Sequence, residues 1–232
     1  MAFVFYYVSR GLVVERTAEA TSRGIQVVQL EQRLGIFLWE TKMQAWVASS
    51  EIVAHIFNNI YVYAHLPLVG VIGLWLFFFH RERYTLLRNA FLISGGIGLI
   101  IFNLFPTAPP RLLPWPLSDQ VVDTMISYSK VNYDIQPAAF VNRYAAMPSL
   151  HFGWNLLVGG TVVAVCRMRT FRILAACVTI AMLIAVVLTA NHFVLDVIAG
   201  AAVALIGLAA SARLQSLALP TWAAGGNART AP

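Results

Sequence analysis

The sequence predicts an all-α, polytopic membrane helix bundle, and two features of its composition carry that prediction. Of the 232 residues, 59% are hydrophobic and only 11% are charged, whereas soluble domains carry about 25% charged residues. The apolar residues also form runs long enough to cross a bilayer as helices, which takes about 20 residues. We therefore expect an integral membrane protein with five full transmembrane helices plus a short N-terminal hydrophobic segment.

The chain divides into three parts by composition. Residues 1–50 begin with a short hydrophobic segment, which we interpret as the end of a first transmembrane helix that is shortened or lacks an upstream start. Apolar residues then alternate with charges, as is typical of amphipathic helices at a membrane interface. Residues 51–213 form the membrane domain, and residues 214–232, rich in Ala, Gly and Pro, are expected to be a disordered tail. The expected spans are residues 52–79, 89–105, 147–166, 171–190 and 193–212.

Residues 106–146 are the long stretch between spans that is not hydrophobic. It opens with several prolines, including Pro106, Pro109 and Pro110, which exclude a regular helix there. Loops of this length in compact proteins are usually lids or binding loops. We therefore expect this segment to contribute to a site.

Positive charge is concentrated in two short connections between spans. The arginines concerned are Arg81, Arg83 and Arg88 in one connection and Arg167, Arg169 and Arg172 in the other. Such an excess marks the cytoplasmic side of a membrane protein. The loop at 106–146 and the turn at 190–192 would then lie on the extracytoplasmic face, in the plasma membrane. The net charge of +6 follows from this topology, and no basic patch with interleaved aromatic residues points to nucleic acid.

Ionisable side chains gather at the ends of the apolar runs beside that face. His151 stands near the start of one span, and His192 and Asp196 stand near the start of another. A single histidine there is more often a capping residue, but the convergence of several costly groups favours a shared polar site. His192 and Asp196 are four positions apart and so share one helix face. The carboxylate can then hold one imidazole nitrogen as N–H and leave the other free as a base or nucleophile.

Two arginines and a helix start suit this site to a phosphate ester. Arg111 and Arg143 fall on the same predicted face, and the guanidinium fork matches phosphate oxygens. Ser149 precedes a span, so backbone amides at a helix N-terminus would be available to an anion. One histidine can attack phosphorus while the other protonates the leaving oxygen. Metal ligation is the competing use of these side chains, but the spacing matches no metal motif, so we expect no metal and no cofactor.

The span at 52–79 carries polar residues in the half before Pro67. Asn58, Asn59 and His65 are candidates for a headgroup or product path. Hydrogen bonding between helices is an equally good interpretation of the same residues.

The stretch from Met147 to His151, with the sequence MPSLH, and the pair His192-x-x-x-Asp196 resemble the type 2 phosphatidic acid phosphatase (PAP2) superfamily. Within it, they are most similar to the branch with Pro-Ser-Leu-His that includes inositol phosphorylceramide synthase-like proteins. Together with the Ala-Pro-Pro-Arg motif that ends at Arg111, the resemblance covers roughly residues 30–212.

The resemblance implies a six-helix membrane bundle and metal-independent phosphoryl chemistry through a phosphohistidine. It implies that His192 is the nucleophile, that Asp196 orients it, and that His151 is the general acid. It also implies that Ser149 and Arg111 bind the phosphate.

The chain departs from the family pattern where phosphate ligands are expected. Leu150 replaces a glycine, residues 185–186 are Ala-Val instead of Ser-Arg, and Leu104 stands where a lysine is usual. Arg143 is the candidate replacement for one missing cation. These departures leave room for a phosphotransferase, because a lipid or polyol hydroxyl can discharge the same intermediate as water.

The predicted function is a membrane phosphatase that cleaves a lipid-linked phosphate ester or anhydride, such as a phosphatidate, a lipid pyrophosphate or a polyprenyl phosphate. A phospholipid headgroup phosphotransferase is the first alternative. A non-catalytic lipid scaffold or transporter is the second, although a scaffold has no need of His151, His192 and Asp196 together. The expected partners are the lipid phosphate and the bilayer, and the oligomeric state is left open.

Overall fold

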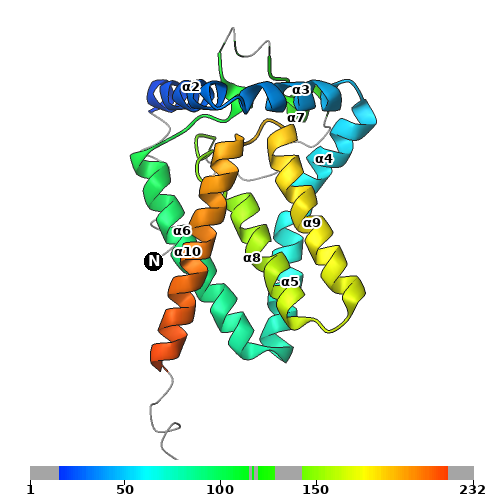
Figure 1. Cartoon of the computed structure of the whole chain (residues 1–232), viewed down its shortest axis with the longest axis vertical. Coiled ribbons are helices and arrows are strands. Elements are labelled where there is room, and N and C mark those ends of the chain that lie inside the picture. The colour runs from blue at the N-terminus through cyan, green and yellow to red at the C-terminus, as the bar shows by residue number, and fades with distance from the viewer. Residues whose placement is uncertain (1–15, 115–116, 118–119, 129–142, 219–232) are drawn as a thin grey trace, which may run out of the picture.

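The computed structural model describes residues 16–114, 117, 120–128 and 143–218, and within them the predicted all-helical class is confirmed. Helices run up and down to form a bundle, and two further helices lie across one end of it (Figure 1). The bundle consists of α4 (Glu51–Tyr63), α5 (His65–Phe79), α6 (Arg81–Leu104), α8 (Leu150–Val165), α9 (Arg169–Leu188) and α10 (Val194–Ala218). The crossing helices are α2 (Thr17–Arg33) and α3 (Phe37–Ala48).

Three helices of the described chain, α6, α9 and α10, are long and apolar enough to cross a membrane. A fourth span results if α4 and α5 are taken together, and α8 is apolar but has only 16 residues. The expected number of five full spans therefore stays a prediction, because a span needs about 20 residues.

The segment expected as one tilted span at 52–79 is instead two helices, α4 and α5, bent by 43° at their junction. The cause is Pro67, which has no N–H to donate to the carbonyl of Tyr63, four residues earlier. Helix α4 accordingly ends at Tyr63, and α5 begins at His65. The bend places His65, which is 5% exposed, in the interior of the bundle.

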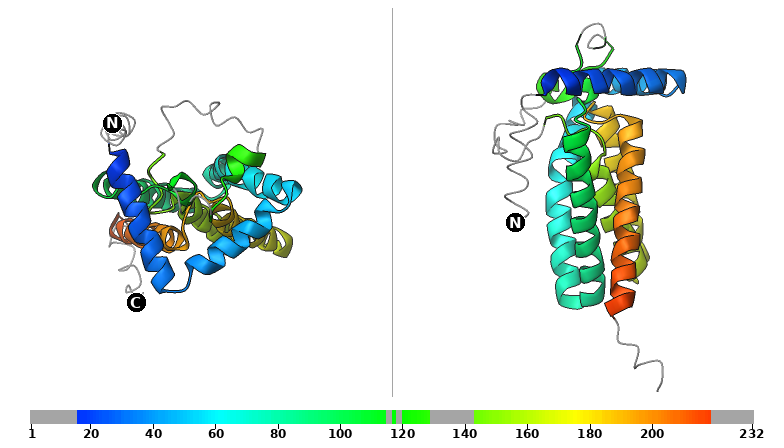
Figure 2. Two further views of the ribbon diagram at one scale, coloured as in Figure 1. Left: turned by 90° about the horizontal axis from the view of Figure 1, so that it is seen from above. Right: turned by 90° about the vertical axis from the view of Figure 1, so that its left-hand side faces the viewer.

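Helices α2 and α3, which we call the roof helices, cover the end of the bundle as a layer of their own (Figure 2). Gly35, with φ of 72°, forms the turn between them. Their inner face packs on the segment before α10 through Val28, Phe37 and Phe193, all buried. Their other side exposes large apolar side chains, namely Leu34, Leu38, Trp39 and Trp46. In α3 the polar Glu40 and Gln44 are buried while these apolar side chains are exposed, so the expected amphipathic helices at an interface stay a prediction.

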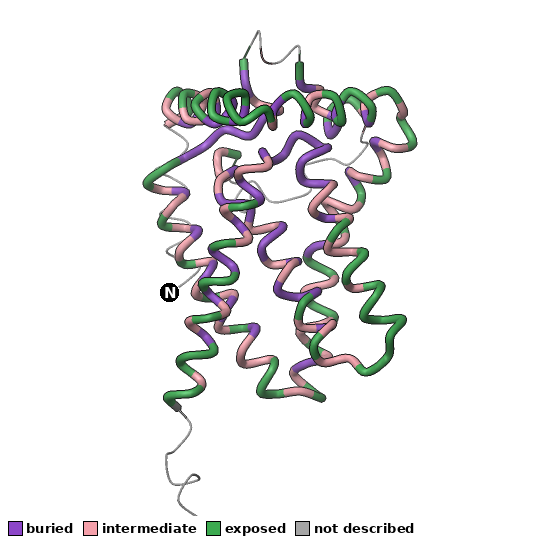
Figure 3. The backbone as a smooth tube through the Cα atoms, viewed as in Figure 1, coloured by how far each residue is buried: buried purple, intermediate pink, exposed green. Residues whose placement is uncertain are grey.

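Buried residues are concentrated in the half of the bundle beneath the roof helices, while the far half is largely exposed along its helices (Figure 3). The α5–α6 and α8–α9 connections, which carry the arginine excess, lie at that far end (Figure 1). The two ends of the bundle therefore differ: one carries the basic connections, and the other is covered by the roof helices.

Some predicted segments lie outside the described residues, and others differ from the prediction in their secondary structure. The short N-terminal hydrophobic segment and the segment 129–142 lie outside the described residues. Helix α10 runs to Ala218, so residues 214–218, expected in the tail, are helical instead. Within the long loop, the proline-rich opening contains only the short η1 (Pro110–Leu112), and the polar part that follows contains the short helix α7 (Thr124–Tyr128).

Candidate active site

His192 lies in the tight turn between α9 and α10, directly beneath the roof helices. Its backbone N–H donates to the Val186 carbonyl at 2.9 Å, and the residue is 4% exposed. Ala190, two residues earlier, has φ of 58°, so a non-glycine residue adopts the left-handed conformation to reverse the chain here. A backbone held in this region costs energy and persists only where the surroundings enforce it.

The tautomer of His192 follows from its contacts. Nδ1 lies 2.8 Å from the carbonyl oxygen of Ala146 and 3.5 Å from Oδ2 of Asp196. Because a carbonyl oxygen can only accept, Nδ1 must carry the hydrogen. The lone pair of the neutral ring is then on Nε2. The sequence predicted Asp196 as the orienting group, and the geometry adds the Ala146 carbonyl as the closer one.

Asp196 is fully buried, and it accepts hydrogen bonds through one side-chain oxygen and through its backbone carbonyl. Its Oδ2 accepts the N–H of Phe193 at 2.9 Å, and its backbone carbonyl accepts the N–H of Ser149 at 2.9 Å. One residue thus caps α10, lies against the His192 ring, and connects α10 to the start of α8.

Two glutamates from the roof helices accept backbone N–H groups in the first turn of α10. Glu40 Oε1 accepts the Val194 N–H at 2.7 Å, and Glu31 Oε1 accepts the Leu195 N–H at 2.9 Å. Burial raises the pKa of Glu31 to about 7, and burial with the neighbouring Glu31 charge raises the pKa of Glu40 to about 9.

Our sequence analysis did not identify these glutamates, although a signal was present. Glu31 follows Val27 by four residues and Val28 by three, so it lies on the apolar face of its helix. Glu40 follows the buried Phe37 by three residues. An acid on the buried face of an amphipathic helix is the pattern that could have revealed Glu31, whereas α3 has apolar residues on all sides and gives no such signal for Glu40.

The N-terminus of α8 packs directly on α10. Ser149 is its N-cap, fully buried, with Oγ accepting the Phe152 N–H at 3.5 Å. Close approach is possible because Gly200 has no side chain: a Cβ there would lie 2.1 Å from the Ser149 carbonyl oxygen. This contact holds the two histidine-bearing segments together, and the rings of His151 and His192 have centroids 6.1 Å apart.

His151 is surrounded by rings on its other sides. Tyr61 stacks on it at 4.8 Å between centroids, and His65 lies at the same distance, tilted by 45°. Asn155 links the two histidines, because its Nδ2 lies 2.6 Å from His65 Nδ1 and 2.9 Å from the His151 carbonyl oxygen. His151 is therefore positioned between His192 and a second, buried imidazole.

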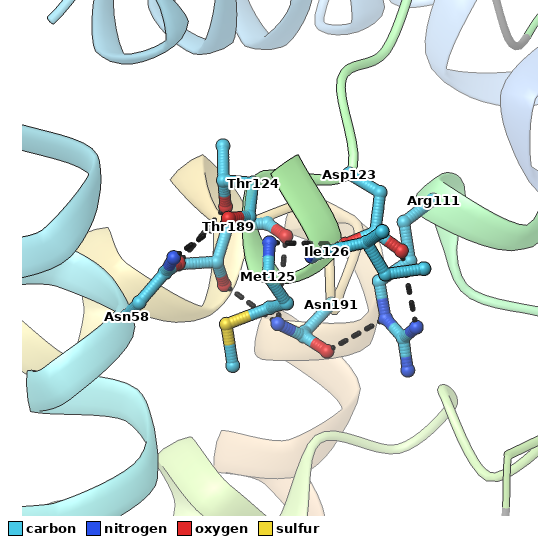
Figure 4. Close-up of polar contacts among 8 residues, drawn as sticks. All are labelled: Asn58, Arg111, Asp123, Thr124, Met125, Ile126, Thr189 and Asn191. Carbon is cyan, nitrogen blue, oxygen red and sulfur yellow. Dashed lines mark hydrogen bonds and ion pairs between the residues drawn. The ribbon is translucent and has the colours of Figure 1, made fainter. Parts of the chain in front are cut away.

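Arg111 is held between Asn191, which precedes His192 in the chain, and Asp123 (Figure 4). Its N–H donates to the Ala190 carbonyl at 3.1 Å, and its Nε donates to Asn191 Oδ1 at 2.9 Å. Its Nη1 lies 3.4 Å from Asp123 Oδ2. The other oxygen of Asp123 accepts from the amides of Met125 and Ile126, so Asp123 also caps α7.

The remaining predicted residues lie apart from this cluster. Arg143 is exposed at the edge of the segment outside the described residues. Asn58 exchanges hydrogen bonds with Thr124, which fits the interpretation as a bond between helices. Asn59 is exposed and donates to the carbonyl of His55 in its own helix. Of the three candidates for a headgroup path, the structure places His65 beside His151.

Among the residues that the structure describes, no three His, Cys, Asp or Glu side chains are grouped so that they could hold a metal ion. The groups around His192 are two acceptors, the Ala146 carbonyl and the Asp196 carboxylate, together with backbone and side-chain amides. This set suits orientation of an imidazole and binding of an anion.

One comparison with known proteins concerns the family and another concerns the fold. The family model of the PAP2 superfamily matches residues 25–210. The crystal structure of Aquifex aeolicus LpxE is similar at a TM-score of 0.52, with 14% sequence identity, over 70% of this chain and 86% of that chain. At this identity the likeness concerns the fold alone. A search of curated proteins found no match, and the finer resemblance to the inositol phosphorylceramide synthase-like branch stays a prediction.

Proposed function

We propose a reaction for this chain from one premise, which is that it belongs to the PAP2 superfamily. Membership in that superfamily and the apolar helices support a membrane lipid phosphatase. We infer that the substrate is a lipid-linked phosphate ester or anhydride of the phosphatidate, lipid pyrophosphate or polyprenyl phosphate type.

The observation that carries the mechanism is the bond from His192 Nδ1 to the Ala146 carbonyl. It leaves the Nε2 lone pair to attack phosphorus, so that a P–N bond forms as the P–O bond to the lipid breaks. The resulting imidazolium is stabilised by Asp196, 3.5 Å from Nδ1. His151 gives a proton to the leaving oxygen and then takes one from the water that hydrolyses the phosphohistidine.

Phosphate binding falls to groups that surround the attack position. Arg111 supplies a guanidinium held by Asn191 and Asp123. Ser149 and the first amides of α8 supply neutral donors at a helix N-terminus. No step of this mechanism requires a metal ion, because the nucleophile is a side chain and not an activated water.

The site is proposed to face the extracytoplasmic side of the plasma membrane. Its residues lie at the roofed end of the bundle, and the arginine-rich connections lie at the opposite end (Figure 1). Positive charge in short loops favours the cytoplasmic side for that opposite end.

A second candidate function is transfer of the phosphoryl group to a lipid or polyol hydroxyl. The observation that favours it is His65, a buried imidazole against His151 on the side away from His192. An acceptor hydroxyl bound there would lie next to the group that must remove its proton. Free phosphate and new phospholipid, measured together with and without polyol acceptors, distinguish the two functions.

The mechanism is tested by measuring how the loss of each histidine affects substrates with poor and with good leaving groups. His192→Ala should abolish turnover of every substrate, because no covalent intermediate can form. His151→Ala should lose about 10²–10⁴-fold on a lipid phosphate, whose alkoxide needs a proton. It should keep much more activity on p-nitrophenyl phosphate, because the leaving group, p-nitrophenolate, is a stable anion that needs no proton.

The matched control is His55→Ala, which removes a histidine of α4 that pairs with the exposed Glu51. It should behave as the unaltered protein on both substrates. The assignment of roles fails if His151→Ala is equally inactive on both, or if the good leaving group rescues His192→Ala.

A further inference from the structure

The start of α10 is held by two buried acids that the mechanism above does not use. Glu31 is 0% exposed and Glu40 is 3% exposed, although both belong to the roof helices at the surface of the bundle. Neither glutamate takes part in the proposed reaction. Each accepts one backbone N–H from the first turn of α10. That turn carries Asp196 and follows His192 directly.

The geometry of the two carboxyls calls for one shared proton. The second oxygen of each, Oε2, is buried without a hydrogen-bond donor among the described residues, and the two carboxyls contact each other. Two ionised carboxylates cannot remain adjacent in a buried position, because like charges repel strongly there. A single proton between them satisfies both oxygens and leaves one negative charge at the positive end of α10.

We propose that Glu31 and Glu40 form one proton-sharing pair that fixes the first turn of α10, and therefore the His192 ring, to the roof helices. The pair acts through position and does not touch the substrate. Without it, the amides of Val194 and Leu195 would lose their acceptors, and the turn that orients His192 would lose its hydrogen bonds to α2 and α3. The effect on catalysis rests on the proposed function, whereas the effect on stability does not.

The charged groups around the pair determine the sign of its pH dependence. Helix α10 contributes Asp196, whose negative charge raises the pKa of both glutamates further, and α9 contributes the neutral Val187 carbonyl, bonded to Gln44 of α3. The folded pKa of Glu40, about 9, is above its ordinary value of 4.5. The stability from the shared proton is therefore present at low pH and is lost as the pH rises through about 9.

The test compares Glu40→Gln, Glu40→Leu and the control Glu51→Gln in the full chain, reconstituted in lipid nanodiscs. The glutamine amide keeps an oxygen for the Val194 N–H and an N–H for Glu31, but it cannot ionise. Leucine keeps the bulk and loses both. Glu51 also lies in the first turn of a helix, but its side chain is 74% exposed.

Thermal unfolding midpoints are measured between pH 6 and pH 10, a readout that does not require activity. The unaltered protein and Glu51→Gln should lose stability toward pH 10, and Glu40→Gln should lose much less over the same range. Parallel pH profiles for the unaltered protein and Glu40→Gln would overturn the shared proton. This holds even if Glu40→Leu fails to fold.

The kinetic measurement uses p-nitrophenyl phosphate. Glu40→Leu should lower kcat by roughly tenfold or more with little change in KM, because displacement of the nucleophile affects the transition state more than binding. Glu40→Gln should keep a larger share of kcat, and its ratio to the unaltered protein should rise above pH 9. A Glu40→Leu variant with unaltered kcat would refute a positioning role. If the unaltered protein hydrolyses no phosphate at all, the proposed function fails while the unfolding profiles still test the pair.

Discussion

Replacement of Gly200 by alanine is the most direct test of how the two histidines are held together. The added Cβ would lie 2.1 Å from the Ser149 carbonyl oxygen and 2.8 Å from its carbonyl carbon. Both are backbone atoms, so no change of rotamer can relieve the clash. Ordinary contact begins at 3.4 Å, so the start of α8 must move away from α10 by about 1.3 Å.

The size of the effect follows from that displacement. Overpacking of a core by one methyl group costs about 1–3 kcal/mol. Loss of the hydrogen bond from Ser149 to the Asp196 carbonyl adds about 1 kcal/mol. The displacement also moves His151 relative to His192, and a misplacement of about 1 Å can cost about 10²-fold in rate.

The assay measures the unfolding midpoint and kcat/KM on p-nitrophenyl phosphate, with Gly160→Ala as the matched control. Gly160 is also on a bundle helix, α8, but a Cβ there would meet nothing within 4 Å. Its replacement should stabilise the helix by about 0.5–1 kcal/mol and leave turnover unchanged. If Gly200→Ala unfolds at the same temperature as the unaltered protein and turns over equally fast, the contact does not hold the site.

Four further predictions follow from the site and its placement. Arg111→Lys keeps the charge but loses the planar fork, so kcat/KM should fall about tenfold or more, equivalent to about 1.4 kcal/mol; a fully active variant would assign phosphate binding to other groups. Asp196→Asn should reduce turnover of lipid and aryl phosphates by a similar factor, because it disturbs the nucleophile and not the leaving group; selective loss on one substrate would contradict this. Activity should survive strong chelators, and loss that zinc or magnesium restores would favour a metal site instead. Single cysteines at Asp123 and Arg169 should be labelled from opposite sides of intact cells, and labelling from the same side would reverse the topology.

The residues whose chemistry is rare beside hydrocarbon could be predicted from the sequence. His151, His192 and Asp196 stood out because few other ionisable groups interrupt the apolar runs, and their spacing indicated helix ends. The structure brings all three into one cluster, with Arg111 one contact away from His192 through Asn191.

Contacts made by backbone atoms could not be predicted in the same way. The closest partner of His192 Nδ1 is the carbonyl of Ala146, and any residue at that position would supply a carbonyl. The break between α4 and α5 had a visible cause in Pro67, but its consequence, the placement of His65 against His151, depends on how two helices pack. The inward direction of Glu31 could be read from helical spacing, whereas its partner on α10 could not.

The N-termini of α10 and α8 differ in the charge of the groups that cap them. At α10 the amides of Phe193, Val194 and Leu195 are each bonded to a carboxylate, so negative charge already occupies that helix end. At α8 the cap is the neutral hydroxyl of Ser149. A phosphate dianion bound there would therefore be repelled by the N-terminus of α10 and attracted by that of α8. In the proposed mechanism, this asymmetry would favour one orientation of the phosphoryl group beside His192.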